Sequence, residues 1–384
     1  MNIFFNRLKD NEQCPCGSGL AFKECCKNQK SSVVESPKPT DVLLMEKMRF
    51  SMKACCMHPD KEHCKGKIKA AHALQNNKII SRLAGKSRHV YVLDSLSKQI
   101  LVPLDTGETI PIVNIRKVSA NAATTLNCFC DYHDNVAFAN IEKGAPNFDN
   151  TETMNFTYAY KAFIFEYYKQ RTAFDIFKKS FKENPPAFLN KKGVALYRMM
   201  QLKMKEFDSV KDFFDKKILS KATDGLYTCA IMIHKSINFA DYAYFAPEYD
   251  MNGRKIKHTK HGVMHRISLT IFPEENCSWL LLSCLESEKE IYEEFFLQMK
   301  NASFDKMKYY INLVLPLYSE NIVLSPNLWE SWDEETQCAF IFYANLQGID
   351  AMKMGMTVGM ALKNAFNDKT GNSYKVLPRI GILV

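Results

Sequence analysis

The 384-residue chain contains no run of eighteen apolar residues, which argues against an ordinary membrane-spanning helix. The segment Met1–Lys9 is too short for a signal peptide and is interrupted by Asn6 and Arg7. We therefore expect a cytoplasmic protein with no membrane partner.

Three common signatures of catalysis or nucleotide binding are also absent. The sequence has no G-x-x-x-x-G-K-[ST] phosphate loop, no G-x-G-x-x-G dinucleotide-binding loop and no G-x-S-x-G nucleophile turn. These absences argue against an ATPase of the phosphate-loop type, a Rossmann enzyme and a hydrolase with a nucleophile turn. No internal repeat is found either, so a solenoid is not expected.

Cysteine, in contrast, is abundant and unevenly placed. Nine of the thirteen cysteines lie before residue 131. In a chain without a secretion signal, clustered cysteines hold metal more often than they form disulfides. The later cysteines are expected to be small buried hydrophobic residues; they are Cys229, Cys277, Cys284 and Cys338.

The composition favours an α+β protein with a real core, because 46% of the residues are hydrophobic and 12% are aromatic. We expect a small zinc knuckle at 1–30, and a linker at 31–40 that is rich in Ser, Pro and Lys. A treble-clef-like Cys/His region should follow at 41–150. Residues 151–384 should form a larger, mostly helical domain with an antiparallel sheet, for which the sequence indicates no role.

Local patterns predict the individual elements. Helices are expected at 41–53, 68–84, 154–183, 191–217, 222–235, 289–300, 304–315 and 326–346. Strands are expected at 89–93, 99–103, 109–115, 239–246, 265–272 and 278–284. Pro185 and Pro186 should end the third of these helices. Ser325 should cap the last one, with Pro326 as its first residue.

The first candidate metal site consists of two close cysteine pairs, Cys14 and Cys16 followed by Cys25 and Cys26. Two thiolate pairs joined by a glycine-bearing turn can converge on one tetrahedral zinc ion. Four thiolates leave no open coordination position, so the expected zinc is structural rather than catalytic.

This stretch, which reads C-P-C-G-S-G, then Phe22, then C-C, closely resembles the SEC-C motif. That motif is a small zinc module found at the C-terminus of the bacterial preprotein translocase ATPase and in many other bacterial proteins. The resemblance covers residues 14–26. It implies a bacterial zinc protein whose knuckle contacts another protein or the ribosome.

The second candidate metal site combines residues from two distant segments. An early Cys/His pair and a late C-x-x-H are the ligand pairs expected of a treble-clef zinc fold. The expected ligands are Cys56 and Cys64, or Cys55 and His58, together with Cys130 and His133. A second zinc ion is therefore expected here.

Two stretches around these residues are similar to the two halves of the HNH endonuclease motif. Ile68–Leu74 contains an Ala-His pair, and Cys130–Phe138 contains the C-x-x-H followed later by phenylalanine. The resemblance implies that His72 is a general base and that Asp134 binds a catalytic Mg²⁺ or Mn²⁺ ion. Asp134 stands where the family usually has a histidine, and the strands between the two halves would be an insertion.

Basic residues are dense between Lys61 and Arg88, where eight Lys or Arg accompany one acid, Glu62. Such a density suits a polyanion such as nucleic acid, and the alternative is a solvated helix face. The residues expected to hold a phosphodiester backbone are Lys65, Lys67, Lys69, Lys78 and Arg82.

Three functions follow from these patterns. The first is an HNH-like, metal-dependent nuclease. The kinds of protein in which such modules generally occur suggest a role in phage defence. The second is a non-enzymatic zinc protein that binds nucleic acid or the ribosome, and the third is a protein-interaction adaptor. In the last two, the second Cys/His set is a structural zinc site with His72 in the core or among the ligands, or it holds no metal.

Overall fold

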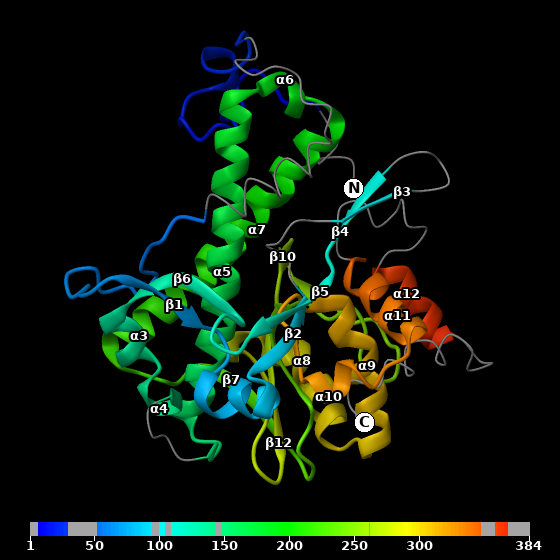
Figure 1. Cartoon of the computed structure of the whole chain (residues 1–384). Helices are drawn as coiled ribbons and strands as arrows, with labels where there is room; N and C mark the ends of the chain where they lie inside the picture. The colour runs from blue at the N-terminus through cyan, green and yellow to red at the C-terminus, as the bar shows by residue number, and fades with distance from the viewer. Residues whose placement is uncertain are drawn as a thin grey trace. The chain divides into compact units, whose positions relative to one another are not determined.

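The computed structural model (Figure 1) describes residues 7–29, 52–93, 100–103, 109–142, 147–260, 262–346 and 358–367. Internal contacts divide the chain into two compact units, which are described separately: Met1–Ala54 with Glu166–Lys216, and Cys55–Phe165 with Lys217–Val384. The linker expected at 31–40 and nearly all of the helix expected at 41–53 lie outside the described residues.

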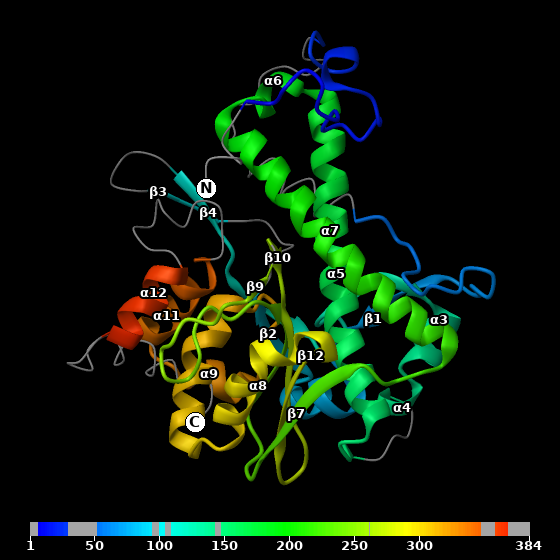
Figure 2. The same ribbon diagram turned by 180° about the vertical axis from the view of Figure 1, so that it is seen from behind.

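The first unit is a helical hairpin with the N-terminal segment packed against it (Figures 1 and 2). Its helices are the second part of α5 (Glu152–Glu183), the short α6 (Pro185–Phe188) and most of α7 (Lys191–Ser220). Proline cannot continue an α-helix, so Pro185 and Pro186 follow the end of α5, as predicted. Gly193 permits the tight turn into α7, because a Cβ there would lie 2.3 Å from the carbonyl oxygen of Phe188.

The second unit is built on a seven-stranded sheet in which neighbouring strands are antiparallel. The order across the sheet is β5-β2-β13-β8-β11-β12-β7. The strands are β2 (His89–Leu93), β5 (Ile115–Ser119), β7 (Leu226–Ile233), β8 (Phe239–Phe245), β11 (Ile267–Pro273), β12 (Ser278–Leu285) and β13 (Val323–Leu324).

Helices cover both faces of this sheet (Figure 2). Alternate strand residues such as Leu269 and Ile271 join one buried cluster with α8 (Lys289–Lys300), α9 (Phe304–Tyr318) and α11 (Glu334–Ala344). The opposite face carries aromatic residues that meet the start of α5. There Tyr158 stacks on Phe272, with ring centroids 4.9 Å apart. Successive strand residues point to opposite faces of the sheet, so Phe272 faces α5 while Leu269 and Ile271 face the other helices. The aromatic residues that recur at helical spacing on α5 therefore form part of the core.

A smaller strand-strand-helix arrangement lies beside the sheet in the same unit. Strand β1 (Ile68–His72) pairs antiparallel with β6 (Thr125–Cys130), and β6 leads directly into α3 (Asp131–Ala137). The segment between β1 and β6 contributes β2 and β5 to the large sheet, so the two halves of the small arrangement are joined through that sheet.

The remaining elements are short. They are η1 (Phe22–Glu24), a π-helical turn η2 (Asn76–Ile80), α2 (Ser81–Ala84), η3 (Gly85–Ser87), β3 (Ile100–Pro103), β4 (Thr109–Ile112), α4 (Ala139–Glu142), β9 (Thr259–Lys260), β10 (Val263–Met264), η4 (Glu286–Glu288), α10 (Pro326–Trp329) and α12 (Val358–Asn367). Ser325 caps α10, because its hydroxyl accepts the Leu328 N–H at 3.2 Å, as predicted.

The α+β prediction is confirmed, and three of the expected helices are wrong in part or in full. The helix expected at 326–346 is divided into α10 and α11, because the chain leaves the helix at residues 330–333 and Asp333 caps a new one. The helix expected at 68–84 begins only at Asn76, because Ile68–His72 forms β1. The helix expected at 222–235 is instead the edge strand β7, which pairs with β12 over its whole length. Its aromatic and β-branched residues suit a pleated, half-buried surface, and tertiary pairing decides the outcome.

Among the helices of the described residues, none is both long enough and apolar enough to cross a lipid bilayer. The cytoplasmic location inferred from the sequence stays a prediction.

Candidate metal centres and the His72 site

The four N-terminal cysteines converge, with all four sulfur atoms within 4.8 Å of one another. The Sγ atoms of Cys16 and Cys25 are 3.5 Å apart, and those of Cys25 and Cys26 are 3.6 Å apart. Zinc–sulfur bonds of about 2.3 Å in a tetrahedron place sulfur atoms roughly 3.8 Å apart. The spacing and the donor chemistry therefore fit one zinc ion with four thiolate ligands.

The backbone of the knuckle brings these cysteines together. The Cys14 N–H donates to the carbonyl of Leu20 at 2.8 Å, and the Phe22 N–H donates to that of Glu12 at 2.8 Å. Between these bonds the chain turns through Gly17 and Gly19, whose φ angles of 78° and 80° favour glycine. The turn explains why both glycines stand between the two cysteine pairs.

The thiols of this cluster differ in acidity, because burial and hydrogen bonds act on them unequally. Burial raises the pKa of Cys14 to about 11 and also raises that of Cys26. Burial acts in the same direction on Cys16, but hydrogen bonds from Ser18 and the neighbouring cysteines lower its pKa to about 7. Four thiolates so close together need a cation, and zinc supplies that charge.

The knuckle packs on the helical hairpin of its own unit. Phe22 is 5% exposed, and its ring meets that of Phe181 edge-on at 6.4 Å. Cys14 and Cys26 belong to the same buried cluster. Arg198 on α7 adds a salt bridge of 3.0 Å to Glu12. Zinc binding and packing against the helices should therefore support each other.

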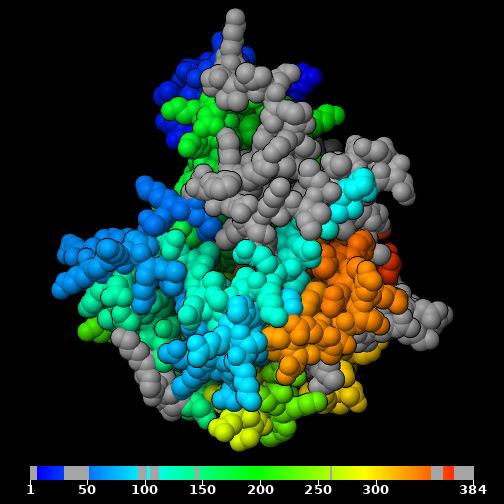
Figure 3. Space-filling view, viewed as in Figure 1, coloured from blue at the N-terminus to red at the C-terminus, as the bar shows by residue number. Residues whose placement is uncertain are grey.

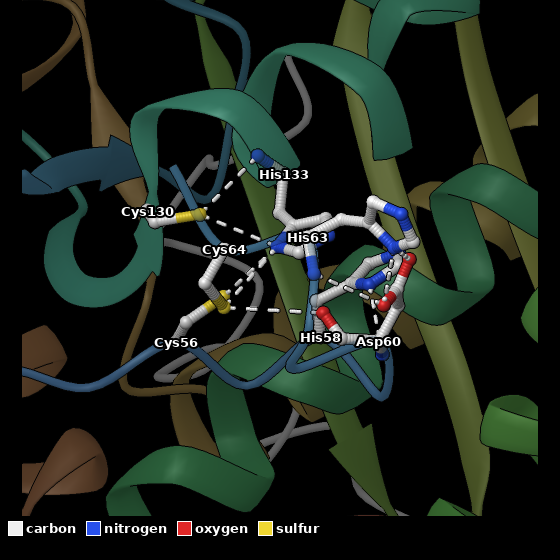
Figure 4. Close-up of polar contacts among 7 residues, drawn as sticks. All are labelled: Cys56, His58, Asp60, His63, Cys64, Cys130 and His133. Atoms are coloured by element: carbon white, nitrogen blue, oxygen red, sulfur yellow. Dashed lines mark hydrogen bonds and ion pairs between the residues drawn. The ribbon is translucent and has the colours of Figure 1, made fainter. Parts of the chain in front are cut away.

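The second cluster joins Cys56 and Cys64 to Cys130 and His133, whose ligand atoms also lie within 4.8 Å of one another (Figure 4). The Nδ1 atom of His133 lies 3.5 Å from the sulfur of Cys56, 3.6 Å from that of Cys64 and 3.3 Å from that of Cys130. Three sulfurs and one imidazole nitrogen form a common structural zinc set. The ion would complete a closed site here as well.

The fold explains how residues 69 positions apart in sequence meet. Cys130 ends β6, and His133 lies in the first turn of α3. The loop with the other two cysteines is tied to β6, because Cys55 N–H donates to the Asn127 carbonyl and Met57 N–H to the Cys128 carbonyl, at 3.1 and 2.8 Å. This loop stands at the surface of the second unit, in blue in Figure 3.

The same geometry decides between the two ligand pairs that the sequence left open. The structure brings Cys56 and Cys64 to the cluster, whereas Cys55 and His58 point elsewhere. The thiol of Cys55 lies 3.6 Å from the Met57 sulfur. The ring of His58 stacks on His133, with centroids 3.9 Å apart and an interplanar angle of 11°. His58 thus packs against a ligand instead of serving as one.

Electrostatics at the second cluster also suit a metal. Burial lowers the pKa of His133, which keeps the imidazole neutral, the form that binds zinc. Burial and the nearby thiols raise the pKa of Cys64 to about 11. Although burial acts to raise it, hydrogen bonds from the backbone of His133 and Lys65 lower the pKa of Cys130.

His72 ends β1, opposite Thr125 on β6. Its Nδ1 lies 3.0 Å from the carbonyl oxygen of Ala123. Because a carbonyl only accepts hydrogen bonds, Nδ1 carries the proton in the neutral ring, and Nε2 keeps its lone pair. Burial lowers the pKa of His72. The ring is therefore held in one tautomer and is neutral at physiological pH.

Charged residues surround His72. Asp134 on α3 is 5% exposed; its Oδ2 lies 2.9 Å from the ammonium of Lys69, and its Oδ1 is buried without a hydrogen-bond partner among the described residues. Lys161 on α5 and Glu142 on α4 form a second, largely buried ion pair. Burial is the largest cause of the lowered pKa of His72, and the hydrogen bond to the Ala123 carbonyl acts against it. The charge of Lys161 lowers this pKa further, while the charges of Glu142 and Asp134 raise it.

No sequence pattern singles out Glu142 and Lys161 as a pair. A lysine within the aromatic run of α5 was the available signal, because buried lysines need an acidic partner. Its side chain is 3% exposed. The partner lies nineteen residues earlier, on a helix that no sequence pattern connects with it.

The five basic residues expected to hold a phosphodiester backbone lie in different environments. Lys65 and Lys67 are exposed on the zinc loop, and the Lys65 ammonium lies 5.7 Å from the centre of the Tyr132 ring. Lys69 is half-buried and pairs with two carboxylates. Lys78 and Arg82 instead line a cavity. Their role in binding stays a prediction.

Comparison with known proteins identifies one short segment. Residues 11–28 match the family model described as the SEC-C motif, in agreement with the resemblance of the N-terminal cysteines. No family model supports the HNH-like region. No curated protein and no solved structure matches the chain.

Proposed function

We propose that the zinc-binding region around β1, β6 and α3 hydrolyses phosphodiester bonds in nucleic acid, with His72 as the general base. One observation carries the proposal. His72 stands at the end of an antiparallel strand pair that leads straight into α3, and its Nδ1 is fixed by the Ala123 carbonyl. The strand pair brings together the two stretches that resemble the HNH motif, Ile68–Leu74 and Cys130–Phe138, because Ile68 pairs with Cys130.

The chemistry asked of His72 is modest. A neutral imidazole with a free Nε2 can take a proton from water, so that the water oxygen attacks phosphorus. The burial that lowers the pKa of His72 keeps this base unprotonated at neutral pH. Neither zinc site can replace it, because both ligand sets are closed. Their role would be to hold the strand pair and the loop in place.

The motif resemblance assigns a divalent cation to Asp134. Mg²⁺ binds proteins through one or two carboxylates and keeps several waters. Asp134 offers Oδ1, which is buried and without a hydrogen-bond partner among the described residues, while Lys69 occupies the side of Oδ2. When bound, Mg²⁺ or Mn²⁺ would stabilise the negative charge of the leaving oxygen.

The substrate backbone would meet exposed cations on the same unit. Lys65 and Lys67 lie on the surface of the zinc loop, and Arg82 is exposed on α2. Each phosphate contact of this kind makes binding weaker as salt rises. We therefore expect cleavage to be sensitive to ionic strength.

A plasmid-nicking assay with Mg²⁺ or Mn²⁺ tests the proposal. His72→Ala should reduce cleavage by about 10²–10⁴-fold, with zinc content unchanged. His89→Ala is a matched control, because His89 also bonds a backbone carbonyl through Nδ1, at 2.6 Å, but is exposed on β2. Equal cleavage by wild type and His72→Ala would contradict the proposal.

A non-enzymatic zinc protein that binds nucleic acid, the ribosome or another protein is the second candidate. The ion pair between Lys69 and Asp134 favours it, because this contact already neutralises the carboxylate without any added cation. Salt-sensitive binding of DNA or RNA without cleavage would support this candidate. Absence of such binding at low salt would leave the adaptor role, with the SEC-C knuckle as the contact surface.

Phage defence is kept as part of the first proposal and rests on the motif resemblance alone. Expression of wild type in a bacterium should then lower phage plaque counts, and expression of His72→Ala should not.

A further inference from the structure

A cavity of about 140 Å³ opens in the second unit close to the His72 strand. Gln75, three residues after His72, lines it, together with Lys78 and Arg82 from the next two turns. Its apolar wall consists of Ile79, Ile141, Phe148, Met154, Tyr158 and Phe272. Polar and charged side chains line the rest of the cavity, and a concave site that combines both kinds of group is a usual form of a small-molecule site.

The size and the wall of the cavity suit a single flat ring. Cavities of about 150 Å³ with apolar walls bind benzene. The aromatic wall is itself ordered, since Phe148 packs edge-on against both Tyr158 and Phe272, with centroids 5.8 and 6.1 Å apart. A single six-membered ring matches this volume more closely than the fused rings of a purine.

Two polar groups in the cavity wall lack partners among the described residues. Gln75 is 5% exposed and uses one amide N–H for the carbonyl of Glu142 at 3.0 Å, which leaves its own Oε1 without a hydrogen bond. Tyr158 is 8% exposed, and its hydroxyl forms no hydrogen bond with the described part of the chain. These two atoms line the cavity and are open to hydrogen bonds from a ligand that carries polar atoms on its ring.

The carboxylate in the cavity wall already has hydrogen-bond partners. Glu274 accepts the Phe148 N–H at 2.7 Å through Oε1 and the Trp279 ring N–H at 3.3 Å through Oε2. Each of its two oxygens thus accepts a hydrogen bond from the protein, and its negative charge lies in the cavity wall. The charge that a ligand meets at the rim comes instead from Lys78 and Arg82.

Arg82 is exposed and forms no ion pair with any residue of the described ranges. It follows Lys78 by one helical turn, so the two cations stand together at one side of the cavity. Arginine and lysine paired in this way are typical of phosphate contacts. The cavity thus combines a ring-sized apolar space, unpaired polar atoms and an anion-binding rim.

We propose that this cavity binds the base of a pyrimidine nucleotide, with Gln75 and Tyr158 bonded to the ring edge and Arg82 to the phosphate. The inference rests on the proposed function, because it adds a base-binding site beside the His72 centre. The nucleotide comes either from a nucleic-acid strand, as an unstacked base of the substrate, or from a free nucleotide that regulates the site. Both sources share the same chemistry.

Calorimetry on the full-length protein separates these cases. Cytidine 5′-monophosphate, adenosine 5′-monophosphate, ribose 5-phosphate and a cytidine-rich oligonucleotide serve as the probes. Cytidine monophosphate should bind at least about tenfold more tightly than the other two small probes, because only it supplies both the small ring and the phosphate. Tighter binding of the oligonucleotide than of the free nucleotide identifies a strand as the source, and the reverse identifies a free ligand.

Variants at the rim and at the wall test the assignment of roles. Arg82→Ala should weaken cytidine monophosphate at least about tenfold. Tyr158→Phe should weaken it by a smaller factor, with ribose 5-phosphate unaffected. Lys86→Ala is the control, because Lys86 is another exposed cation of the same basic segment that does not line the cavity. Zinc content verifies that each variant is folded.

Equal binding of the pyrimidine and purine nucleotides, or an unchanged affinity in Arg82→Ala, would overturn the inference. The catalytic proposal is tested separately by His72→Ala, which should bind cytidine monophosphate like wild type. Nucleotide binding without any cleavage would therefore refute the nuclease and keep the base-binding site. Cleavage without pyrimidine binding would do the opposite.

Discussion

Replacement of Phe22 by alanine tests whether the zinc knuckle depends on the helices beneath it. The ring of Phe22 is 5% exposed and lies in one buried cluster with Phe177, Phe181 and Tyr197. Removal of a buried phenylalanine ring costs about 3–5 kcal/mol. Because folding of the knuckle and zinc binding are linked, that loss should weaken zinc at this site on the order of 100-fold or more.

Titration with a chelator measures this effect. Wild type should release zinc in two steps, and Phe22→Ala should move only one of them to lower chelator concentration. Leu20→Ala is the matched control, because Leu20 stands in the same loop and is 52% exposed. If Phe22→Ala and Leu20→Ala release zinc at the same chelator concentration, the packing of the knuckle on α5 and α7 does not stabilise the site.

Three further predictions follow from single contacts. Burial lowers the pKa of His72 below its ordinary value of 6.5. The cleavage rate should therefore stay level as pH falls past 6.5 and decline only around the lowered pKa. A decline of the rate that sets in at pH 6.5 or above would contradict this. The same group binds a proton more readily in the unfolded chain, so its contribution to stability falls as pH drops from about 6.5 towards the lowered pKa. Glu142→Gln leaves the buried ammonium of Lys161 without its carboxylate and should lower the free energy of unfolding in urea by about 2–3 kcal/mol. The control Glu330→Gln breaks an exposed ion pair and should leave the urea midpoint unchanged. Ser325→Ala removes the cap of α10 and should cost about 1 kcal/mol; an unchanged midpoint would show that the cap is dispensable.

Local sequence patterns predict long helices and flanked strands well in this protein. The aromatic spacing of α5 and the double proline after it fix both the helix and its end. The sequence pattern predicts a helix for the segment that forms β7, because a short apolar run fits a buried helix and a buried strand equally. Only pairing with β12, whose partner residues lie some fifty positions later, decides it.

The candidate sites divide in a similar way. The cysteine spacing predicts both metal clusters, because zinc ligands commonly come in closely spaced pairs that can be recognised in the sequence. The choice of Cys56 over Cys55 depended on the backbone bond from Met57 to Cys128, which no spacing rule contains. The pair of Glu142 and Lys161 and the aromatic wall of the cavity arise where α4, α5 and β11 meet. Such juxtapositions are set by tertiary packing, so a single sequence does not predict them.

The most direct test of the account is the zinc content of purified protein, measured by mass spectrometry on wild type, Cys56→Ser and Cys55→Ser. Two closed sites, with Cys56 as a ligand and Cys55 outside the cluster, predict two zinc ions in wild type and in Cys55→Ser, and one in Cys56→Ser. One zinc ion in wild type, or loss of zinc from Cys55→Ser with none from Cys56→Ser, would contradict the second metal centre.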